Sequence, residues 1–142
     1  MNVKKIVSIL FVILCFITLS FAQDNQQETR DPNAPKNTIK IPGTEIYVRG
    51  SDEAARMPYD VAKNACACKG DGWRLPTIEE LKIIYDYNAM VGNFSREYYW
   101  AYDRKIYSGR FYNLNFKNGR ISDEKVGENN KVRCIWSSKK PE

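Results

Sequence analysis

The 142-residue sequence contains no histidine, and this absence excludes several kinds of catalytic and metal site. Ser-His-Asp triads, Cys-His dyads and metal sites with an imidazole ligand all require this residue. A catalyst without histidine needs paired carboxylates, a tyrosine base or an activated thiol. The adjacent Glu79 and Glu80 diverge by about 100° on a helix and do not form such a pair. We therefore expect a protein that is not an enzyme and that uses no cofactor.

Long apolar runs are also scarce, and the one that is present lies at the N-terminus. Lys4 and Lys5 precede an apolar run over residues 6–19, and a small-x-small pattern follows just before a polar segment. This pattern predicts a secretory signal peptide over residues 1–22, with cleavage after Ala22. The mature protein is then secreted, periplasmic or held at the cell surface.

Two alternatives to cleavage stay open at this stage. The apolar run could act as an uncleaved membrane anchor, although a span needs about 20 apolar residues and this run is shorter. Cys15 could carry a lipid, although Leu14 stands where a lipobox has a small residue. No other segment is apolar enough to cross a bilayer, so we expect no membrane span in the mature chain.

The positive charge of the chain is modest. The net charge is +5, and without residues 1–22, which hold two lysines and no acidic residue, it is +3. An exported protein does not normally meet nucleic acid, so we expect no nucleic-acid partner. A charge of this size is ordinary for solubility, and it also suits acidic glycans or anionic surfaces.

The mature sequence divides into a spacer and one domain. Residues 23–38 are polar, contain two prolines and show no apolar period, which predicts a disordered spacer. Residues 39–142 are expected to form a single domain, as is usual for a chain of this length. Its first element is a predicted strand over Ile39–Arg49, inside which Pro42-Gly43 turns the chain.

Two helices are predicted next. Pro58 suits a first helical turn, and the apolar spacing predicts a helix over Tyr59–Cys68 that ends before Gly70-Asp71-Gly72. Thr77 and Glu80 form a capping box at the start of the second helix, because each side chain can accept a free backbone N–H. The buried stripe of this second helix is expected to contain Ile78, Leu81, Ile84 and Tyr85.

The second half of the sequence has the pattern of short strands. Asn118-Gly119 is a strong hairpin signal between two of them. A strand, two helices and then several strands make an α+β fold. The predicted strands are Tyr98–Tyr102, Lys105–Phe116, Arg120–Glu124 and Lys131–Ser137.

One segment resembles a bacterial family of extracellular domains. It runs from Ala62 to Leu81, has the sequence AKNACACKGDGWRLPTIEEL, and is accompanied by Tyr99-Trp100, by Phe116-Lys-Asn-Gly119 and by Val132-Arg133-Cys134. The family comprises the C-terminal-type domains of collagen-like adhesins and the major paralogous domains of Bacteroidetes and Fibrobacter. The resemblance covers roughly residues 46–136. It implies a C-type-lectin-like fold in which two helices pack on a small, twisted, mainly antiparallel sheet, with the Gly-Trp-Arg-Leu-Pro-Thr motif as a determinant of the fold.

The same resemblance implies a disulfide between the first helix and the last strand. The bridge is expected between Cys66 and Cys134, with Cys68 and Cys134 as the alternative. The leftover cysteine is either free and buried or pairs with another chain, so a disulfide-linked dimer is a possible assembly. A metal or redox site at Cys66-x-Cys68 is not expected, because one residue separates the sulfurs and no further ligand is near in sequence.

Aromatic and basic side chains alternate closely over residues 96–112. Strand alternation places Tyr98, Trp100 and Tyr102 on one face and Tyr99 on the other. Tyrosines exposed beside arginines on one face would suit sugar rings or protein hot spots. The alternative is that the aromatic side chains simply fill both sides of the sheet. The candidate ligand-binding residues are Tyr99, Tyr102, Arg104, Tyr107, Arg110 and Tyr112.

Calcium is not expected in this binding site. Lectins of this fold that use calcium carry Glu-Pro-Asn or Gln-Pro-Asp and a later Trp-Asn-Asp, and the sequence has none of these. Asp123, Glu124 and Glu128 are acidic, but a solvated loop explains them better than the converging ligands of a calcium site.

These observations together predict an exported, non-catalytic binding module that acts without calcium. The expected partner is a glycan or a protein of the envelope or host. The alternative is a structural or assembly subunit of a surface complex, attached through the spacer or the leftover cysteine. The fold does not specify the ligand, because folds of this kind are scaffolds for variable loops.

Overall fold

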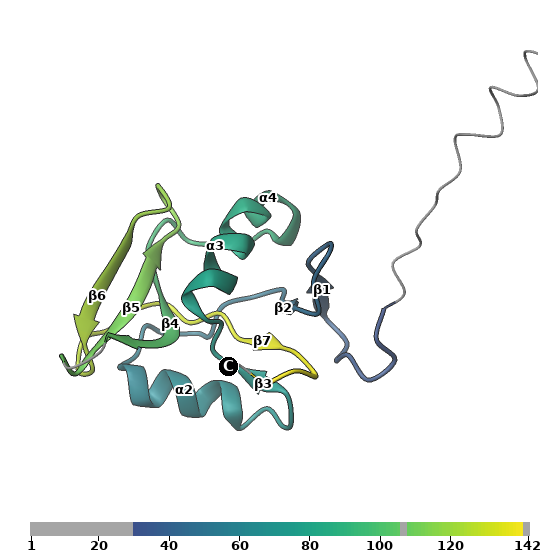
Figure 1. Ribbon diagram of the computed structural model, residues 1–142, viewed down its shortest axis with the longest axis horizontal. Helices are drawn as coiled ribbons and strands as arrows, with labels where there is room; N and C mark the ends of the chain where they lie inside the picture. Colours follow the sequence, from purple (N-terminus) through teal and green to yellow (C-terminus); the bar gives the residue numbers. More distant parts are fainter. Residues whose placement is uncertain (1–29, 106–107, 141–142) are drawn as a thin grey trace, which may run out of the picture.

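The computed structural model describes residues 30–105 and 108–140 and contains two antiparallel sheets and helical segments (Figure 1). The first sheet has the order β1-β2-β7-β3 and the second has the order β4-β5-β6. The predicted α+β class is confirmed. The strands are β1 (Thr38–Lys40), β2 (Tyr47–Arg49), β3 (Trp73–Arg74), β4 (Tyr98–Lys105), β5 (Arg110–Asn115), β6 (Ile121–Lys125) and β7 (Ile135–Trp136), and the helices are α2 (Tyr59–Ala67), α3 (Ile78–Asp86) and α4 (Asn88–Val91).

The predicted strand over Ile39–Arg49 is a hairpin of two short strands. Ile39 of β1 is opposite Val48 of β2, and the backbone N–H of Ile41 donates to the carbonyl of Ile46 at 2.9 Å. Gly43 has a φ of +71°, which glycine adopts without the steric cost of a side chain. Pro42-Gly43 therefore turns the chain, as the sequence indicated.

Residues 30–38, which the sequence assigned to the spacer, contact this hairpin. The Arg30 guanidinium donates to the Thr38 carbonyl at 3.0 Å and lies 5.2 Å from the centre of the Tyr47 ring. The Tyr47 hydroxyl accepts a hydrogen bond from the backbone N–H of Asp31 at 2.6 Å. The predicted boundary at residue 39 consequently falls inside β1, which begins at Thr38.

The predicted signal peptide and the rest of the predicted spacer, residues 1–29, lie outside the described residues. Cys15 is among them. Over the part of the chain that the structure describes, no helix has the length and apolar character needed to cross a membrane.

Both predicted helices are present. Helix α2 begins after Pro58 and ends at Ala67, with Cys68 as its C-cap. At the start of α3, the Thr77 hydroxyl accepts from the Glu80 N–H at 3.2 Å, and the Glu80 carboxylate accepts from the Thr77 N–H at 2.7 Å. The predicted capping box is thereby confirmed. The short helix α4 was not predicted, because it has no side-chain cap and spans only four residues.

The predicted hairpin at Asn118-Gly119 is present in the β-rich second half of the chain. The Gly119 N–H donates to the Asn115 carbonyl at 2.8 Å, which closes the turn between β5 and β6. The predicted strand over Lys105–Phe116 is shorter than expected, because Ser108 and Gly109 turn the chain before β5. The last predicted strand is also reduced, to the two residues of β7.

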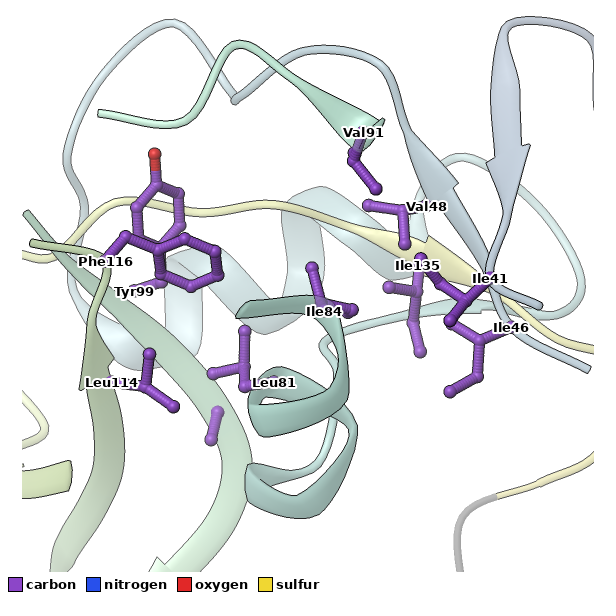
Figure 2. Close-up of a cluster of buried hydrophobic side chains, with 11 residues drawn as sticks. Ile41, Ile46, Val48, Leu81, Ile84, Val91, Tyr99, Leu114, Phe116 and Ile135 are labelled. Atoms are coloured by element: carbon purple, nitrogen blue, oxygen red, sulfur yellow. The ribbon is translucent and has the colours of Figure 1, made fainter. Parts of the chain in front are cut away.

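Helix α3 lies between the two sheets and supplies the centre of the main core (Figure 1). Figure 2 shows Leu81 and Ile84 of this helix between apolar side chains from both sheets. Leu114 and Phe116 come from the β5 side, and Ile135 comes from β7. Each residue named here is less than a tenth exposed, so this cluster joins the two sheets into one core.

A second apolar cluster holds α2 against β4 and contains the disulfide. Cys66 is bonded to Cys134 with a Cα–Cα distance of 5.4 Å, which confirms the predicted pairing. Both cysteines are fully buried beside Trp100 and Leu75. Cys68, the alternative partner, is free but exposed, so the prediction that a free leftover cysteine is buried is wrong.

The Gly-Trp-Arg-Leu-Pro-Thr motif connects these parts. Gly72 has a φ of +81°, and a Cβ atom there would lie 2.6 Å from Nε1 of Trp136 and 2.9 Å from the Ser137 carbonyl. Leu75 is fully buried, and Arg74 forms a two-pronged ion pair with Glu80 of α3, with N–O distances of 2.7 and 2.8 Å. The motif thus acts in folding, through one glycine, one apolar anchor and one ion pair.

Gly72→Ala is expected to lower the free energy of unfolding by about 2–3 kcal/mol. The left-handed backbone costs an L-residue roughly 1–2 kcal/mol, and the contact with Trp136 and the Ser137 carbonyl adds to this cost. Urea denaturation measures the change. Gly43→Ala is the matched control, because its φ is +71° but its Cβ would meet nothing within 4 Å. An equal loss in both variants would contradict the close approach at Gly72.

Candidate functional site

Strand β4, which carries the predicted aromatic site, is buried on both faces at its centre. Tyr99 and Ala101 belong to the main core, and Trp100 belongs to the cluster beneath α2. All three are fully buried. The prediction that Tyr99 is exposed is therefore wrong. Strand alternation showed which residues share a face, but it could not show that helices cover this strand from both sides.

The hydroxyl of Tyr99 is instead part of a buried polar network. It donates to Oδ2 of Asp52 at 2.7 Å and accepts from the Ser95 N–H at 2.8 Å. Burial, together with the hydrogen bond to Asp52, raises the pKa of Tyr99 to about 12, against the opposing effect of Ser95. The phenol consequently stays protonated at neutral pH and acts as a structural donor.

The other predicted ligand-binding residues do not share one surface. Tyr102 is half-buried against the α2 cluster, with the Lys63 ammonium 5.8 Å from its ring centre. Tyr112 is half-buried against the main core, on the opposite side of the sheet. The side chain of Arg104 and the whole of Tyr107 lie outside the described residues. A role of Tyr102, Arg104, Tyr107, Arg110 or Tyr112 in ligand binding stays a prediction.

Arg110 is held by its neighbour on β6. Its guanidinium pairs with Asp123, which also accepts from the Lys105 ammonium at 3.0 Å. The hydrogen bonds from Arg110 and Lys105 hold the pKa of the Asp123 carboxyl below its ordinary value. Glu124, from the same acidic segment, accepts from the Asn130 amide at 2.8 Å. Among the described residues, no three His, Cys, Asp or Glu side chains are placed to hold a metal ion.

Two adjoining clefts lie beside the Gly-Trp-Arg-Leu-Pro-Thr motif, with volumes of about 630 and 550 Å³. Several of the charged groups that line these clefts are used inside the protein. Arg74 pairs with Glu80, the Asp103 carboxylate accepts from the Ile78 N–H at 2.5 Å, and Glu79 pairs with a neighbouring lysine. These clefts therefore surround a structural ion pair and the start of α3, and Glu45, Lys139 and Lys140 also belong to their charged lining.

The substitution Glu80→Gln tests the structural role of the Arg74–Glu80 ion pair, because the difference in stability between this variant and wild type should depend on pH. Burial opposes ionisation of Glu80, but hydrogen bonds from Arg74 and Thr77 outweigh burial and hold the pKa of this carboxyl below its ordinary value of 4.5. The stabilisation is therefore present above pH 4.5 and is lost as the pH falls through the lowered pKa. We expect the variant to unfold about 1–2 kcal/mol more easily than wild type near pH 7, and the gap to narrow near pH 3.

Urea denaturation at the two pH values measures this gap. Glu79→Gln is the control, because the Glu79 side chain is 72% exposed in its pair with Lys82 and should change stability by less than about 0.5 kcal/mol. A gap for Glu80→Gln that is the same at both pH values would show that ionised Glu80 is not what stabilises this turn.

A third, smaller cleft of about 240 Å³ lies where β4 begins and β5 ends. We call it the amide cleft, because three asparagines line it. The strands place Tyr98 opposite Asn115, and the segment after β6 brings two further asparagines over them. The lining residues are Arg56, Arg96, Glu97, Tyr98, Asn115, Asn129 and Asn130.

Backbone hydrogen bonds fix the walls of the amide cleft. Met57 and Asn130 form a two-way bridge, with N–O distances of 3.0 and 3.3 Å. The Lys131 N–H donates to the Tyr98 carbonyl at 2.9 Å, and the Trp100 N–H donates to the Lys131 carbonyl at 3.1 Å. The segment that carries Asn129 and Asn130 is thus held to the edge of β4, which pre-organises the cleft.

Hydrogen bonds within the protein also fix the orientation of two of these side-chain amides. Oδ1 of Asn115 accepts from the Lys117 N–H at 2.8 Å, which leaves Nδ2 as the free donor. Nδ2 of Asn130 donates to Glu124 at 2.8 Å, which leaves Oδ1 as the free acceptor. Arg96 is exposed and makes no ion pair with any described residue. Two residues that line the cleft consequently carry an oriented free donor and an oriented free acceptor, and a third carries an unpaired guanidinium.

Sequence reasoning did not identify the amide cleft. Asn115, Asn129 and Asn130 have turn-forming side chains, and nothing in the sequence distinguishes a turn asparagine from one that faces a cleft. The pair of asparagines after Glu128 was the only local indication. Their approach to Tyr98 depends on the pairing of Met57 with Asn130, which joins segments more than 70 residues apart.

The fold can be compared with solved structures. Botrocetin is 11% identical to this chain with a TM-score of 0.53, and the match covers 75% of this chain and all of botrocetin. EMS16, an antagonist of the collagen receptor integrin α2β1, is 13% identical with a TM-score of 0.52, over 74% of this chain and all of EMS16. Both are C-type-lectin-like snake-venom proteins. The fold is C-type-lectin-like.

A third similar structure is the complex of botrocetin with a mutant von Willebrand factor A1 domain. This match has a TM-score of 0.51 and an identity of 11%, and it covers 75% of this chain and all of the matched chain. The sequence itself matches no protein-family model and no curated protein. The structural likeness confirms the C-type-lectin-like fold that the motif implied, and membership of the bacterial adhesin-type family stays a prediction.

Proposed function

We propose that this protein is an exported, non-catalytic binding module that recognises a glycan or a protein of the envelope or host without calcium. The observation that carries the proposal is the amide cleft, in which polar groups of fixed orientation are left unused by the protein itself. Binding sites of this kind combine a concave surface with a few well-placed polar groups.

Two further features support the proposal. The buried disulfide between Cys66 and Cys134 is of a kind that persists in oxidising compartments, which agrees with export through the predicted signal peptide. Botrocetin, of similar fold, has been solved in complex with a von Willebrand factor domain, so this fold can present a protein-binding surface. Among the described residues that line the amide cleft, Glu97 supplies the one carboxylate, and it pairs with Arg56.

The test is a glycan array probed with the exported protein, accompanied by a pull-down from envelope extract. Each is run with calcium and again with a chelator. We expect the same ligands in both conditions, because the cleft offers amide and guanidinium groups to a ligand. Binding that disappears with the chelator would overturn the calcium-independent part of the proposal, and turnover of a bound ligand would overturn the non-catalytic part.

The alternative function, a structural or assembly subunit, is favoured by one observation, the exposed free thiol of Cys68. It makes a separate prediction. A disulfide-linked dimer on non-reducing gel electrophoresis that is absent in Cys68→Ser would support assembly through this residue. A monomer under oxidising conditions would leave the binding module as the better account.

A further inference from the structure

The charge of the amide cleft is positive once its internal ion pair is considered. Its lining has two guanidinium groups and one carboxylate. Arg56 pairs with Glu97, and the Arg56 side chain is 58% exposed while that of Glu97 is 33% exposed. Arg96, which lines the cleft and is exposed, is left with its full charge. An arginine in this state binds a carboxylate or sulfate group through parallel N–H donors.

The amides of the cleft suit hydroxyl groups. A hydroxyl both donates and accepts a hydrogen bond, so neighbouring hydroxyls on one ring can meet a fixed donor and a fixed acceptor together. Nδ2 of Asn115 and Oδ1 of Asn130 supply these two groups, and Tyr98 adds an aromatic side chain from β4. A volume of about 240 Å³ lies below the roughly 300–1,000 Å³ of clefts for drug-sized ligands, so it accommodates about one sugar ring.

A buried amide lies two residues before Asn115 in β5, although it does not itself line the cleft. Asn113 is fully buried, and neither polar atom of its side chain has a hydrogen-bond partner in the described structure. It lies on the same face of β5 as Asn115, opposite Trp100 on β4 and Ser122 on β6. A buried amide without a partner costs about 1–3 kcal/mol relative to a hydrogen-bonded one, and an apolar side chain would avoid this cost. A polar group that enters from the Asn115 side would explain an asparagine here.

We propose that the amide cleft binds one anionic saccharide residue, with Arg96 on its carboxylate or sulfate group and Asn115 and Asn130 on its hydroxyls. This inference rests on the proposed function and specifies its ligand. Asn113 does not line the cleft, so in this proposal a water that enters behind Asn115 supplies its hydrogen bonds. The pre-organised backbone around Asn130 reduces the entropy lost on binding.

Two substitutions test the proposal on a glycan array, with isothermal titration of the strongest carboxylated, sulfated and neutral glycans. Arg96→Gln removes the charge, and Asn115→Asp keeps the acceptor for Lys117 while replacing the free donor by a carboxylate. Arg120→Gln is the matched control, because Arg120 is exposed and lies outside the cleft. Thermal denaturation of each variant checks that it is folded.

We expect wild type to bind carboxylated or sulfated glycans in preference to their neutral counterparts. Arg96→Gln should weaken this binding by about tenfold or more, Asn115→Asp should weaken it at least as much, and Arg120→Gln should match wild type. The comparison of carboxylated with sulfated glycans identifies which anionic group the cleft binds. If glycans bind but both cleft variants match wild type, or if only neutral glycans bind, this inference is overturned and the proposed function stands. If the wild-type protein binds a protein ligand but no glycan, this inference is likewise overturned and the proposed function stands. If it binds neither a glycan nor a protein, the inference and the proposed function are both overturned.

Discussion

Arg133→Met is expected to lower the free energy of unfolding by about 3–5 kcal/mol, because the variant leaves the largely buried Asp52 carboxylate, whose side chain is 14% exposed, without its cationic partner. The Arg133 side chain is fully buried, and its Nε donates to Oδ1 of Asp52 at 2.7 Å. Its remaining donors bond the carbonyls of Arg49 at 2.9 Å and Asn93 at 2.7 Å. The guanidinium also lies 4.0 Å from the centre of the Phe94 ring, so one side chain ties three segments together.

The loss is measured by urea denaturation beside a control ion pair. Lys82→Met removes the exposed partner of Glu79 on α3 and should change stability by less than about 0.5 kcal/mol. Arg133→Lys keeps the charge but cannot reproduce the planar fork, so an intermediate loss is expected. If Arg133→Met were as stable as Lys82→Met, the buried network around Asp52 would not be what holds the loop at Asn93 in place.

Removal of the disulfide should have an effect of similar size. The bridge joins residues 68 positions apart, and the chain-entropy account assigns such a loop roughly 4 kcal/mol of stabilisation. The double variant Cys66→Ala/Cys134→Ala is therefore expected to unfold about 4 kcal/mol more easily than oxidised wild type. The cavity left by the two sulfur atoms adds to this loss, and the addition is small if Trp100 and Leu75 repack against the alanines.

The comparison is made by denaturant titration with and without reductant. Cys68→Ser is the control, because this thiol is free and exposed and its loss should leave stability unchanged. Wild type under reducing conditions should approach the double variant, whereas the double variant should not respond to reductant. A wild-type protein whose stability is the same in both conditions would contradict the stabilising role of the Cys66–Cys134 bond.

The elements that could be predicted from the sequence are those with local determinants. Thr77 and Glu80 are three residues apart, so their capping box is specified by the chain around it. Asn118-Gly119 likewise closes a turn between neighbouring strands. The pairing of Cys66 with Cys134 is a distant contact, and it was predicted only because the motif around Cys66 implied the fold.

The parts that could not be predicted depend on what covers each strand. Tyr99 lies in a strand with aromatic residues on both faces, and sequence spacing cannot show that α2 and α3 cover both. The amide cleft depends on the approach of Asn130 to Met57 and on the side-chain orientation that Glu124 imposes. Such orientation arises from contacts between segments far apart in sequence, where local propensity carries no information.

The central claim is that ligand recognition takes place in the amide cleft, and chemical-shift mapping by NMR tests it most directly. The exported protein is titrated with the strongest anionic glycan from the array, and backbone and asparagine side-chain amides are followed. The account predicts that the largest shifts fall on Arg96, Tyr98, Asn115 and Asn130, with the Asn113 side-chain amide shifting as well. Shifts confined to the clefts around Arg74 and Lys139, or to Tyr102 and Tyr112, would contradict it.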